Sequence, residues 1–332
     1  MDIYILNTVI TGKLLSELLC KGLTIKGLIT LDDCGSGKPN EYYDYSEFCE
    51  KNFLECLKVS SYSLKNKNDI NMLKSINIDL LIIAGWQRLI PEWFINHCTI
   101  GVIGNHGSHV GIENGRGRSP QNWALLSGKA EFSISIFWIT PEIDSGQVID
   151  TRVFKYTNTD TILSSHIKVD ICVADMIIQN IDNGLTSEKG VPQKEGGEYL
   201  PQRVREDGKI DWNRNAIDIY NFIRAISSPY PGAYSEYKGR EYIIDIARPI
   251  DIQQGDLFGF CRNGEVISVL DKSFLVKCGE GILQVDKCSR NDIFEGMIFE
   301  SADYKRQIKA IVERHMEKYS TQISKLVYDE LN

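Results

Sequence analysis

The side chains best able to do chemistry gather in one stretch of the chain, from Gly101 to Ile149. His106 is the candidate acid–base residue, because histidine is the side chain that titrates near neutral pH without help from its surroundings. Asp144 stands at an Asp-Ser-Gly turn later in the stretch, and its carboxylate could orient the imidazole ring. Two residues so far apart in sequence could equally serve only to hold the fold. We therefore expect a polar site here and leave its chemistry open at this point.

Other kinds of site are less well supported by the same stretch. A serine-nucleophile triad through Ser108 would lack the G-x-S-x-G elbow. His106 and His109 have no cysteine or carboxylate at ligand spacing, so no metal site is predicted. The glycines form neither a dinucleotide fingerprint nor a Walker A loop. Arg116 and Arg118 are either solvated surface groups or, in a glycine-rich loop, clamps for an anion.

Apolar runs on both sides of this stretch predict the strands that must hold it. Residues 79–85 form an unbroken apolar run, typical of a parallel strand covered on both faces. Residues 99–103 are the next predicted strand, and 132–139 with 147–154 form a strand pair around Asp144. Strands alternate with helices, which predicts a Rossmann-like α/β fold with an open, mostly parallel sheet and helices on both faces. Ligands of such sheets bind at the carboxyl ends of the strands, where the polar loop after residue 103 would lie.

The pattern changes after a long predicted helix over residues 161–183 and a polar linker over 187–197. Short β-rich runs separated by turns then predict a small β-barrel or sandwich, and of these we expect an OB-like barrel. A charged, helical tail follows. The predicted organisation is a catalytic domain over 1–200, a β domain over 201–297 and a helical tail over 298–332.

Composition limits the class of protein. The 332 residues carry a net charge of −8, which argues against a large nucleic-acid interface, since such interfaces need a basic face. No apolar run approaches the roughly 20 residues that span a bilayer, and the chain opens without a basic leader region. Nine cysteines are widely spaced without a Cys-x-x-Cys pair, which favours reduced thiols in a cytoplasmic protein.

Several motifs in fixed order resemble the folate-dependent formyltransferases, the family of methionyl-tRNA formyltransferase and the sugar N-formyltransferases. They are DLLIIAGWQRLIP, GVIGNHGS, GRGRSPQNWALLSG and ITPEIDSGQVI, followed by YLPQRVREDGKIDW and IYNFIRAISSPYPGAYS at the junction with the carboxy-terminal barrel. The resemblance covers nearly the whole chain to about Lys287. It implies an enzyme that transfers formyl from 10-formyltetrahydrofolate to an amine, without a metal.

The resemblance also implies roles for individual residues. The family uses an Asn, His, Asp trio, of which the histidine corresponds to His106 and the aspartate to Asp144. In that chemistry the histidine accepts the proton of the attacking amine, and the amide stabilises the oxyanion. The implied folate contacts are Arg88, Leu89, Ile90, Arg118, Thr140, Pro141, Glu142, Ile143 and Asp144.

The sequence departs from the family pattern at the asparagine. The family motif Asn-x-His-x-Ser would place it at position 104, where this chain has Gly104, and Asn105 stands directly before His106. The loop after Ser108 is also longer than usual. We expect Asn105 to reach the oxyanion through a rearranged loop; the alternative is that backbone N–H groups and water take its role.

Three acceptors of the formyl group compete. Initiator tRNA is disfavoured by the acidic charge balance, and water, in a formyltetrahydrofolate hydrolase, would not call for the barrel domain. A nucleotide-linked amino sugar, used for a surface polysaccharide, needs only a few cations and polar groups, for which Ser108, Arg116 and Arg203 are the predicted residues. A folate-binding relative without activity is the alternative of another class. The helical tail could also pair two copies as a homodimer.

Overall fold

The structure is a computed structural model that describes residues 1–39, 41–194, 197–250 and 258–331. Its contacts group into two compact units, each built from several segments. Unit 1 comprises Met1–Arg116, Ser133–Phe154 and His166–Gly196; unit 2 comprises Gly117–Phe132, Lys155–Ser165 and Gly197–Asn332. The predicted division into domains at residues 200 and 297 stays a prediction.

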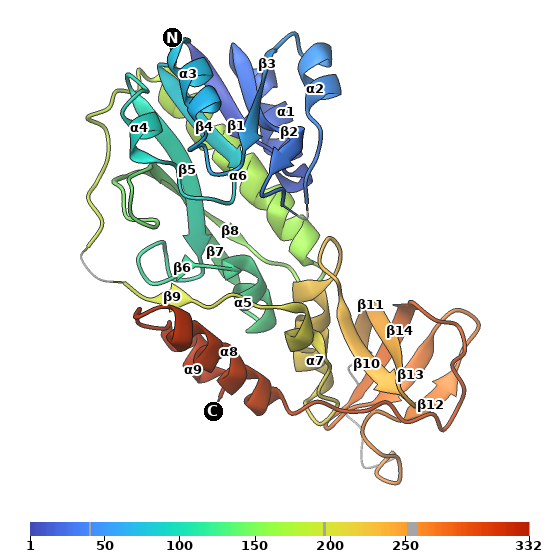
Figure 1. Cartoon of the computed structure of the whole chain (residues 1–332). Coiled ribbons are helices and arrows are strands. Elements are labelled where there is room, and N and C mark those ends of the chain that lie inside the picture. The colour runs from blue at the N-terminus through green and yellow to red at the C-terminus, as the bar shows by residue number, and fades with distance from the viewer. Residues whose placement is uncertain (40, 195–196, 251–257, 332) are drawn as a thin grey trace. The chain divides into compact units, whose positions relative to one another are not determined.

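Unit 1 is organised on a seven-stranded sheet of order β3-β2-β1-β4-β5-β7-β8 (Figure 1). The five strands from β3 to β5 pair in parallel, and β7 runs antiparallel to β5. The predicted fold class, an open and mostly parallel sheet, is confirmed. The strands are β1 (Ile3–Asn7), β2 (Gly27–Ser36), β3 (Glu55–Ser61), β4 (Leu80–Gly85), β5 (Gly101–Ser108), β7 (Glu131–Trp138) and β8 (Val148–Lys155).

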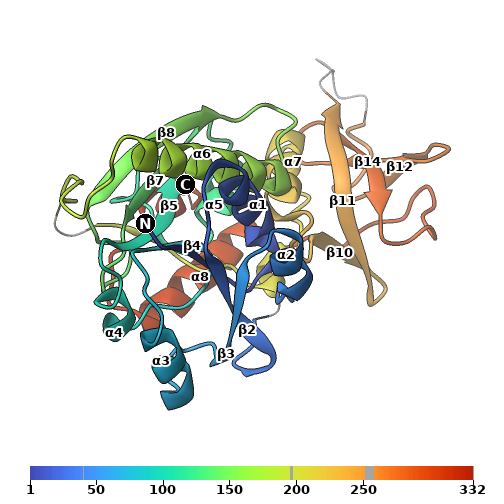
Figure 2. The same ribbon diagram turned by 90° about the horizontal axis from the view of Figure 1, so that it is seen from above.

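Helices lie on both faces of this sheet. Figure 2 shows α1 and α6 on one face, with α3 and α4 on the other. Helices α1 and α6 pack closely, since a Cβ added at Gly22 would lie 2.3 Å from Cδ1 of Ile178. No helix in the described ranges is long and apolar enough to cross a membrane. The helices are α1 (Lys13–Gly22), α2 (Ser46–Lys51), α3 (Lys67–Lys74), α4 (Glu92–Ile95) and α6 (Ile162–Asp182).

Strand β5 is longer than predicted. The expected strand ended at Ile103 and a loop followed, but β5 continues to Ser108. The reason is β7, which pairs with β5 residue by residue from Ile103 to Ser108 without a break in register. The GNHGS sequence therefore lies in a strand, because a tertiary pairing overrides the weak strand propensity of glycine and asparagine.

Unit 2 contains a second sheet, antiparallel and five-stranded, of order β10-β11-β14-β13-β12. It confirms the predicted β-rich carboxy-terminal part, and its core includes the fully buried Trp212. The elements are α5 (Pro120–Leu126), α7 (Ala216–Ile226), β10 (Ala233–Tyr237), β11 (Arg240–Ile250), β12 (Val266–Val269), β13 (Phe274–Lys277) and β14 (Ile282–Cys288). A separate two-stranded pairing joins β6 (Arg116–Gly117) to β9 (Tyr199–Leu200).

The carboxy-terminal tail is helical, as predicted, and is part of the core of unit 2. It forms α8 (Tyr304–Lys318) and α9 (Lys325–Asp329). Main-chain bonds join it to β9, from Tyr199 N to Gln322 O (2.8 Å) and from Ser324 N to Tyr199 O (2.9 Å). Because Ile308 and Val327 are fully buried against unit 2, the tail contributes to the stability of that unit.

Asp170 of α6 generates a prediction about stability. Burial raises the pKa of its carboxyl from 3.8 to about 7, and only a backbone hydrogen bond from Leu15 opposes the shift. Between these two pH values the folded chain holds a proton that the unfolded chain releases, so this group lowers stability as the pH rises. We expect Asp170→Asn to raise the Tm at pH 8 and to leave it unchanged near pH 3.5. Thermal melts across this range test the effect; a difference in Tm that does not vary with pH would contradict it.

Candidate functional site

The site lies where β4 and β5 separate. These strands pair only from Leu80 to Ile82 and from Gly101 to Ile103, whereas β5 stays paired with β7 to Ser108. The first three residues of β4 are buried, and its last three are half-buried. The sheet therefore opens at the carboxyl end of β4, which is where parallel sheets bind their ligands.

His106 projects from the second half of β5 and has an oxygen atom near each ring nitrogen. Its Nε2 lies 2.7 Å from the carbonyl oxygen of Gly115, and its Nδ1 lies 3.6 Å from Oδ2 of Asp144. A carbonyl oxygen only accepts hydrogen bonds, so Nε2 carries the proton of the neutral ring. Nδ1 is then the nitrogen that can take up a proton, and it faces the carboxylate. The structure thus brings together the two residues that the sequence singled out.

Asp144 is held in a tight turn between β7 and β8. Its φ of +49° is in the left-handed region, which is uncommon for a residue other than glycine. Thr140 Oγ1 and Ser145 Oγ share a hydrogen bond of 2.9 Å across the turn. Gly146 is required, because a Cβ there would lie 1.6 Å from the carbonyl oxygen of Trp138. The turn therefore presents the Asp144 carboxylate to His106 from a defined backbone conformation.

The side chain of Asn105 points to the opposite face of the sheet from that of His106. Side chains of successive strand residues point to opposite faces, and β5 has no bulge between Ile103 and Ser108. Asn105 Nδ2 points instead to the carbonyl oxygen of Ile83 on β4, at 3.5 Å. The expectation that a rearranged loop would turn Asn105 toward the oxyanion is not met, because the pairing with β7 keeps this segment extended.

Gly104 shares the His106 face, but the room beside it is filled. A Cβ at position 104 would lie 2.4 Å from Cδ1 of Ile139. Ile139 packs against the apolar core of unit 1. The position at which the family pattern has an asparagine is therefore occupied by an apolar contact.

Two predicted substrate-binding residues are buried in unit 1. Ser108 is fully buried, donates to Gly111 O (2.6 Å) and accepts from Val110 N (3.1 Å), so its hydroxyl closes the loop after β5. Arg116 is 7% exposed and donates from Nη2 to Oε1 of Gln193 at 2.8 Å. Both side chains support the loop around His106, and their predicted contact with a substrate stays a prediction.

The predicted donor-binding residues after β4 lie at the open edge of the sheet. Arg88 is exposed, with its guanidinium over the ring of Tyr62 at 5.3 Å. Leu89 is 60% exposed, whereas Ile90 belongs to the apolar core. Tyr62 also accepts a hydrogen bond of 2.8 Å from Gln87 N through its hydroxyl, which fixes the course of this loop.

The predicted donor-binding residues of the Asp144 turn are mostly exposed. Pro141 and Glu142 are exposed, and Ile143 is 42% exposed. Thr140 is half-buried through its bond to Ser145. Exposed apolar side chains such as Ile143 next to a polar pair are typical of ligand sites.

Two predicted arginines belong to unit 2. Arg118 is exposed, and its backbone N–H donates to Leu200 O at 2.9 Å. Arg203 stacks between the rings of Trp123 and Phe222 at 5.3 and 5.5 Å, and donates from Nη2 to Asp207 O. Burial lowers the pKa of Arg203, and its Nη1 has no hydrogen-bond partner among the described residues.

One residue of the site was missed by the sequence analysis. Gln193 lies in the predicted polar linker, yet its Nε2 donates to the carbonyl oxygens of Asp144 (2.9 Å) and Gly146 (2.8 Å). Its surroundings in sequence, VPQKEGG, are those of an ordinary loop. No pattern in one sequence distinguishes such a glutamine from a solvated one.

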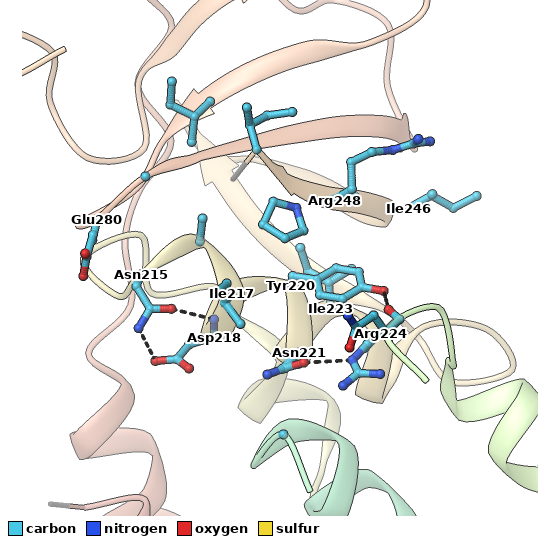
Figure 3. Close-up of a pocket in the computed structure, with 18 of the residues that line it drawn as sticks. Asn215, Ile217, Asp218, Tyr220, Asn221, Ile223, Arg224, Ile246, Arg248 and Glu280 are labelled. Carbon is cyan, nitrogen blue, oxygen red and sulfur yellow. Dashed lines mark hydrogen bonds between the residues drawn. The ribbon is translucent and has the colours of Figure 1, made fainter. Parts of the chain in front are cut away.

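A separate groove of about 1340 Å³ lies in unit 2, between α7 and the second half of β11 (Figure 3). None of the predicted site residues lines it. Some of its polar groups bond to one another, as Asn215 does to Asp218 and Asn221 to Arg224. Within the described ranges, no group of three or more His, Cys, Asp or Glu side chains could hold a metal ion.

The sequence matches the models of two domains of one protein family. Residues 33–170 match the family described as formyl transferase, and residues 203–293 match its carboxy-terminal domain. A methionyl-tRNA formyltransferase of Azobacteroides pseudotrichonymphae is 30% identical over 230 residues, which cover 67% of this chain and 70% of that protein. The family match over residues 33–170 contains His106 and Asp144.

Solved structures share the fold at low identity. HypX of Aquifex aeolicus has a TM-score of 0.59 at 20% identity over 97% of this chain, which spans 48% of the HypX chain. WlaRD, a sugar 3N-formyl transferase solved in the presence of dTDP and 5-N-formyl-THF, has a TM-score of 0.60 at 16% identity, covering 88% of this chain and 98% of that chain.

The position of Asn105 generates a prediction that separates two roles. Because its side chain bonds weakly across the sheet, we expect Asn105→Ala to lower the free energy of unfolding by about 1 kcal/mol or less and to keep catalytic turnover. Denaturant melts and steady-state rates measure the two effects. Loss of a catalytic hydrogen-bond donor costs roughly 10²–10³-fold in turnover, so a fall of that size would instead place Asn105 at the reacting atoms.

Proposed function

We propose that this chain, which belongs to the formyl transferase family, transfers a formyl group from 10-formyltetrahydrofolate to the amine of a nucleotide-linked amino sugar. One observation carries the proposal. The Nδ1 of His106, which carries no proton in the neutral ring, faces the carboxylate of Asp144 at the open end of a parallel sheet. Both residues lie inside the segment that matches the family.

The residues around this opening fit a folate. Leu89 and Ile143 expose apolar surface suited to its ring systems, and Arg88 offers a cation for its carboxylates. Trp86 follows β4 directly, and its buried Nε1 has no hydrogen-bond partner among the described residues, which leaves a donor for a ligand. When bound, 10-formyltetrahydrofolate supplies a formyl group activated for transfer to an amine.

His106 is the proposed general base, and the structure favours its Nδ1 as the proton acceptor. Nε2–H is engaged by Gly115 O, so the proton of the acceptor amine goes to Nδ1. The imidazolium that forms then lies 3.6 Å from Oδ2 of Asp144, whose negative charge stabilises it.

The stabiliser of the charge on the formyl oxygen is a separate question. Gly104 has no side chain, and Asn105 faces the other side of the sheet. We infer that backbone N–H groups take this role. The pairing between β4 and β5 ends at Ile103. Beyond that residue, the main-chain N–H groups of β5 on the β4 side make no ladder hydrogen bonds to β4, so they can act as donors to the formyl oxygen.

Charge supports a small phosphorylated acceptor. The net charge of −8 gives little attraction for a polynucleotide. In unit 2, many basic side chains are also paired with acidic neighbours, which reduces their attraction for a polyanion. The paired cations are Arg205, Lys209, Arg214, Arg240, Arg248, Lys287, Arg290 and Arg314.

The second candidate acceptor is methionyl-tRNA. The observation in its favour is the 30% identity to a methionyl-tRNA formyltransferase over 67% of this chain. Water, in a hydrolase, and loss of activity in a folate-binding relative are the remaining alternatives. Transfer to a sugar, to methionyl-tRNA or to water gives three different products from the same donor, and an inactive relative gives none, so one experiment can separate all four.

The experiment is a screen of purified protein with 10-formyltetrahydrofolate and a panel of acceptors, namely nucleotide-linked amino sugars and charged initiator tRNA, read by mass spectrometry. We expect one acceptor to gain the mass of one formyl group, with tetrahydrofolate as the second product. Formate release without an acceptor would instead identify a hydrolase. Donor binding without any turnover, on sugars, water or methionyl-tRNA, would identify an inactive relative.

The assigned base gives a prediction for the acceptor found in this way. We expect His106→Ala to lower kcat by about 10²–10⁴-fold, the usual contribution of a general base. The fold should persist, because the variant loses one hydrogen bond to Gly115 O, worth roughly 1 kcal/mol. Steady-state rates and a thermal melt check both statements. Turnover near that of the wild type would remove His106 from the mechanism.

A further inference from the structure

The segment Lys189–Lys194 runs along the hairpin that carries Asp144, and the two are bonded at several points. The indole Nε1 of Trp138 donates to Lys189 O at 2.6 Å. Val148 and Val191 exchange two main-chain hydrogen bonds of 2.9 and 2.8 Å. All of these residues belong to unit 1. The segment therefore behaves as part of the hairpin.

Gln193 is the residue of this segment that reaches the catalytic turn. Its amide nitrogen donates to Asp144 O and Gly146 O, the two carbonyls on either side of Ser145. Its amide oxygen accepts from Arg116 Nη2 at 2.8 Å. The side chain thus uses both of its N–H groups and its oxygen on the loops around His106.

These partners admit only one orientation of the amide. A guanidinium only donates and a carbonyl only accepts, so the oxygen must face Arg116 and the nitrogen must face the turn. Of the natural side chains of this length, glutamate and methionine have no N–H to offer the carbonyls. A glutamine at position 193 is therefore specified by its contacts.

The turn that carries Asp144 needs stabilising contacts from outside it, because its own backbone conformation is unfavourable. Asp144 has a φ of +49°, and such left-handed conformations cost free energy in residues with a side chain. Its carboxylate must also lie within a few ångströms of His106 Nδ1 to act on it. A small rotation of the Asp144 backbone would swing the carboxylate away.

We propose that Gln193 is a positioning residue that holds the Asp144 carboxylate against His106, and that Arg116 acts through Gln193 by fixing its amide. This inference rests on the proposed function only in taking the His106–Asp144 pair as the reacting pair. It gives Arg116 a role inside the protein, in keeping with its 7% exposure, where the sequence had suggested contact with the substrate.

Gln193→Met tests the proposal, since it keeps the length of the side chain and removes all three hydrogen bonds. We expect kcat to fall by about 10- to 100-fold, as for a catalytic group displaced by about an ångström. KM for donor and acceptor should change by no more than about two-fold, because neither is contacted. Gln193→Glu keeps an acceptor for Arg116 but sets a carboxylate against two carbonyl oxygens, so its loss should be at least as large.

Gln179→Met is the matched control. Gln179 also accepts from an arginine, Arg152 Nη2, and donates to Asp175 Oδ1, but it lies on the exposed side of α6. This variant loses similar hydrogen bonds, and its kcat should stay at the wild-type value. An equal loss of kcat in both variants would mean a general effect on folding and would overturn the proposal.

A double-mutant cycle separates positioning from stability. If Gln193 acts through Asp144, then Gln193→Met should cost little further activity in an Asp144→Asn background. If the two losses multiply, Gln193 does not act through Asp144 and the proposal fails.

Amide hydrogen exchange tests the same claim without an activity assay, so it holds even if no acceptor is found and the proposed function fails. We expect faster exchange in residues 140–147 in Gln193→Met and in Arg116→Met, and no change there in Gln179→Met. Exchange that stays at the wild-type rate in the Gln193 and Arg116 variants would overturn the proposal.

Discussion

The site depends on one pairing, the antiparallel ladder between β5 and β7. It continues to Ser108, beyond the point at which β4 separates from β5. This ladder keeps the segment around His106 extended at the place where β4 no longer pairs with β5. A histidine on a regular strand has a fixed direction, which a histidine on a long loop would not have. Because successive strand residues point to opposite faces, the same ladder directs the Asn105 side chain away from the face that carries His106.

The partner of His106 comes from a different kind of structure. Asp144 lies on a strained turn, held by its own side-chain bonds, by Gly146 and by Gln193 from a segment far along the chain. The carbonyl of Gly115 adds the last element, because it selects the tautomer of His106 that leaves Nδ1 free. The His106–Asp144 pair is thus assembled from a strand, a turn and two loops. Such an arrangement sets geometry before any ligand binds, which is what general-base chemistry requires.

The sequence contained enough to predict the sheet, the carboxy-terminal β-rich part and the pairing of His106 with Asp144. Those features follow from apolar periodicity and from motif order, which are local signals. It did not predict that β5 continues through GNHGS, because glycine and asparagine favour turns and only the pairing with β7 makes them a strand. Gln193 was missed, and the hydrogen bond between Arg116 and Gln193 was not foreseen, for a related reason. Their roles are hydrogen bonds to residues distant in sequence, and a polar side chain in a polar segment carries no sign of its partner.

The measurement that tests the central claim most directly is a competition for one labelled formyl group. Purified protein would receive 10-formyltetrahydrofolate labelled in the formyl carbon, together with a panel of nucleotide-linked amino sugars and charged initiator tRNA. The account predicts that the label appears on an amino sugar, and that His106→Ala and Asp144→Asn greatly reduce its appearance. Label on methionyl-tRNA, or only in formate, would contradict the proposed acceptor, and transfer at the wild-type rate in both variants would contradict the proposed site.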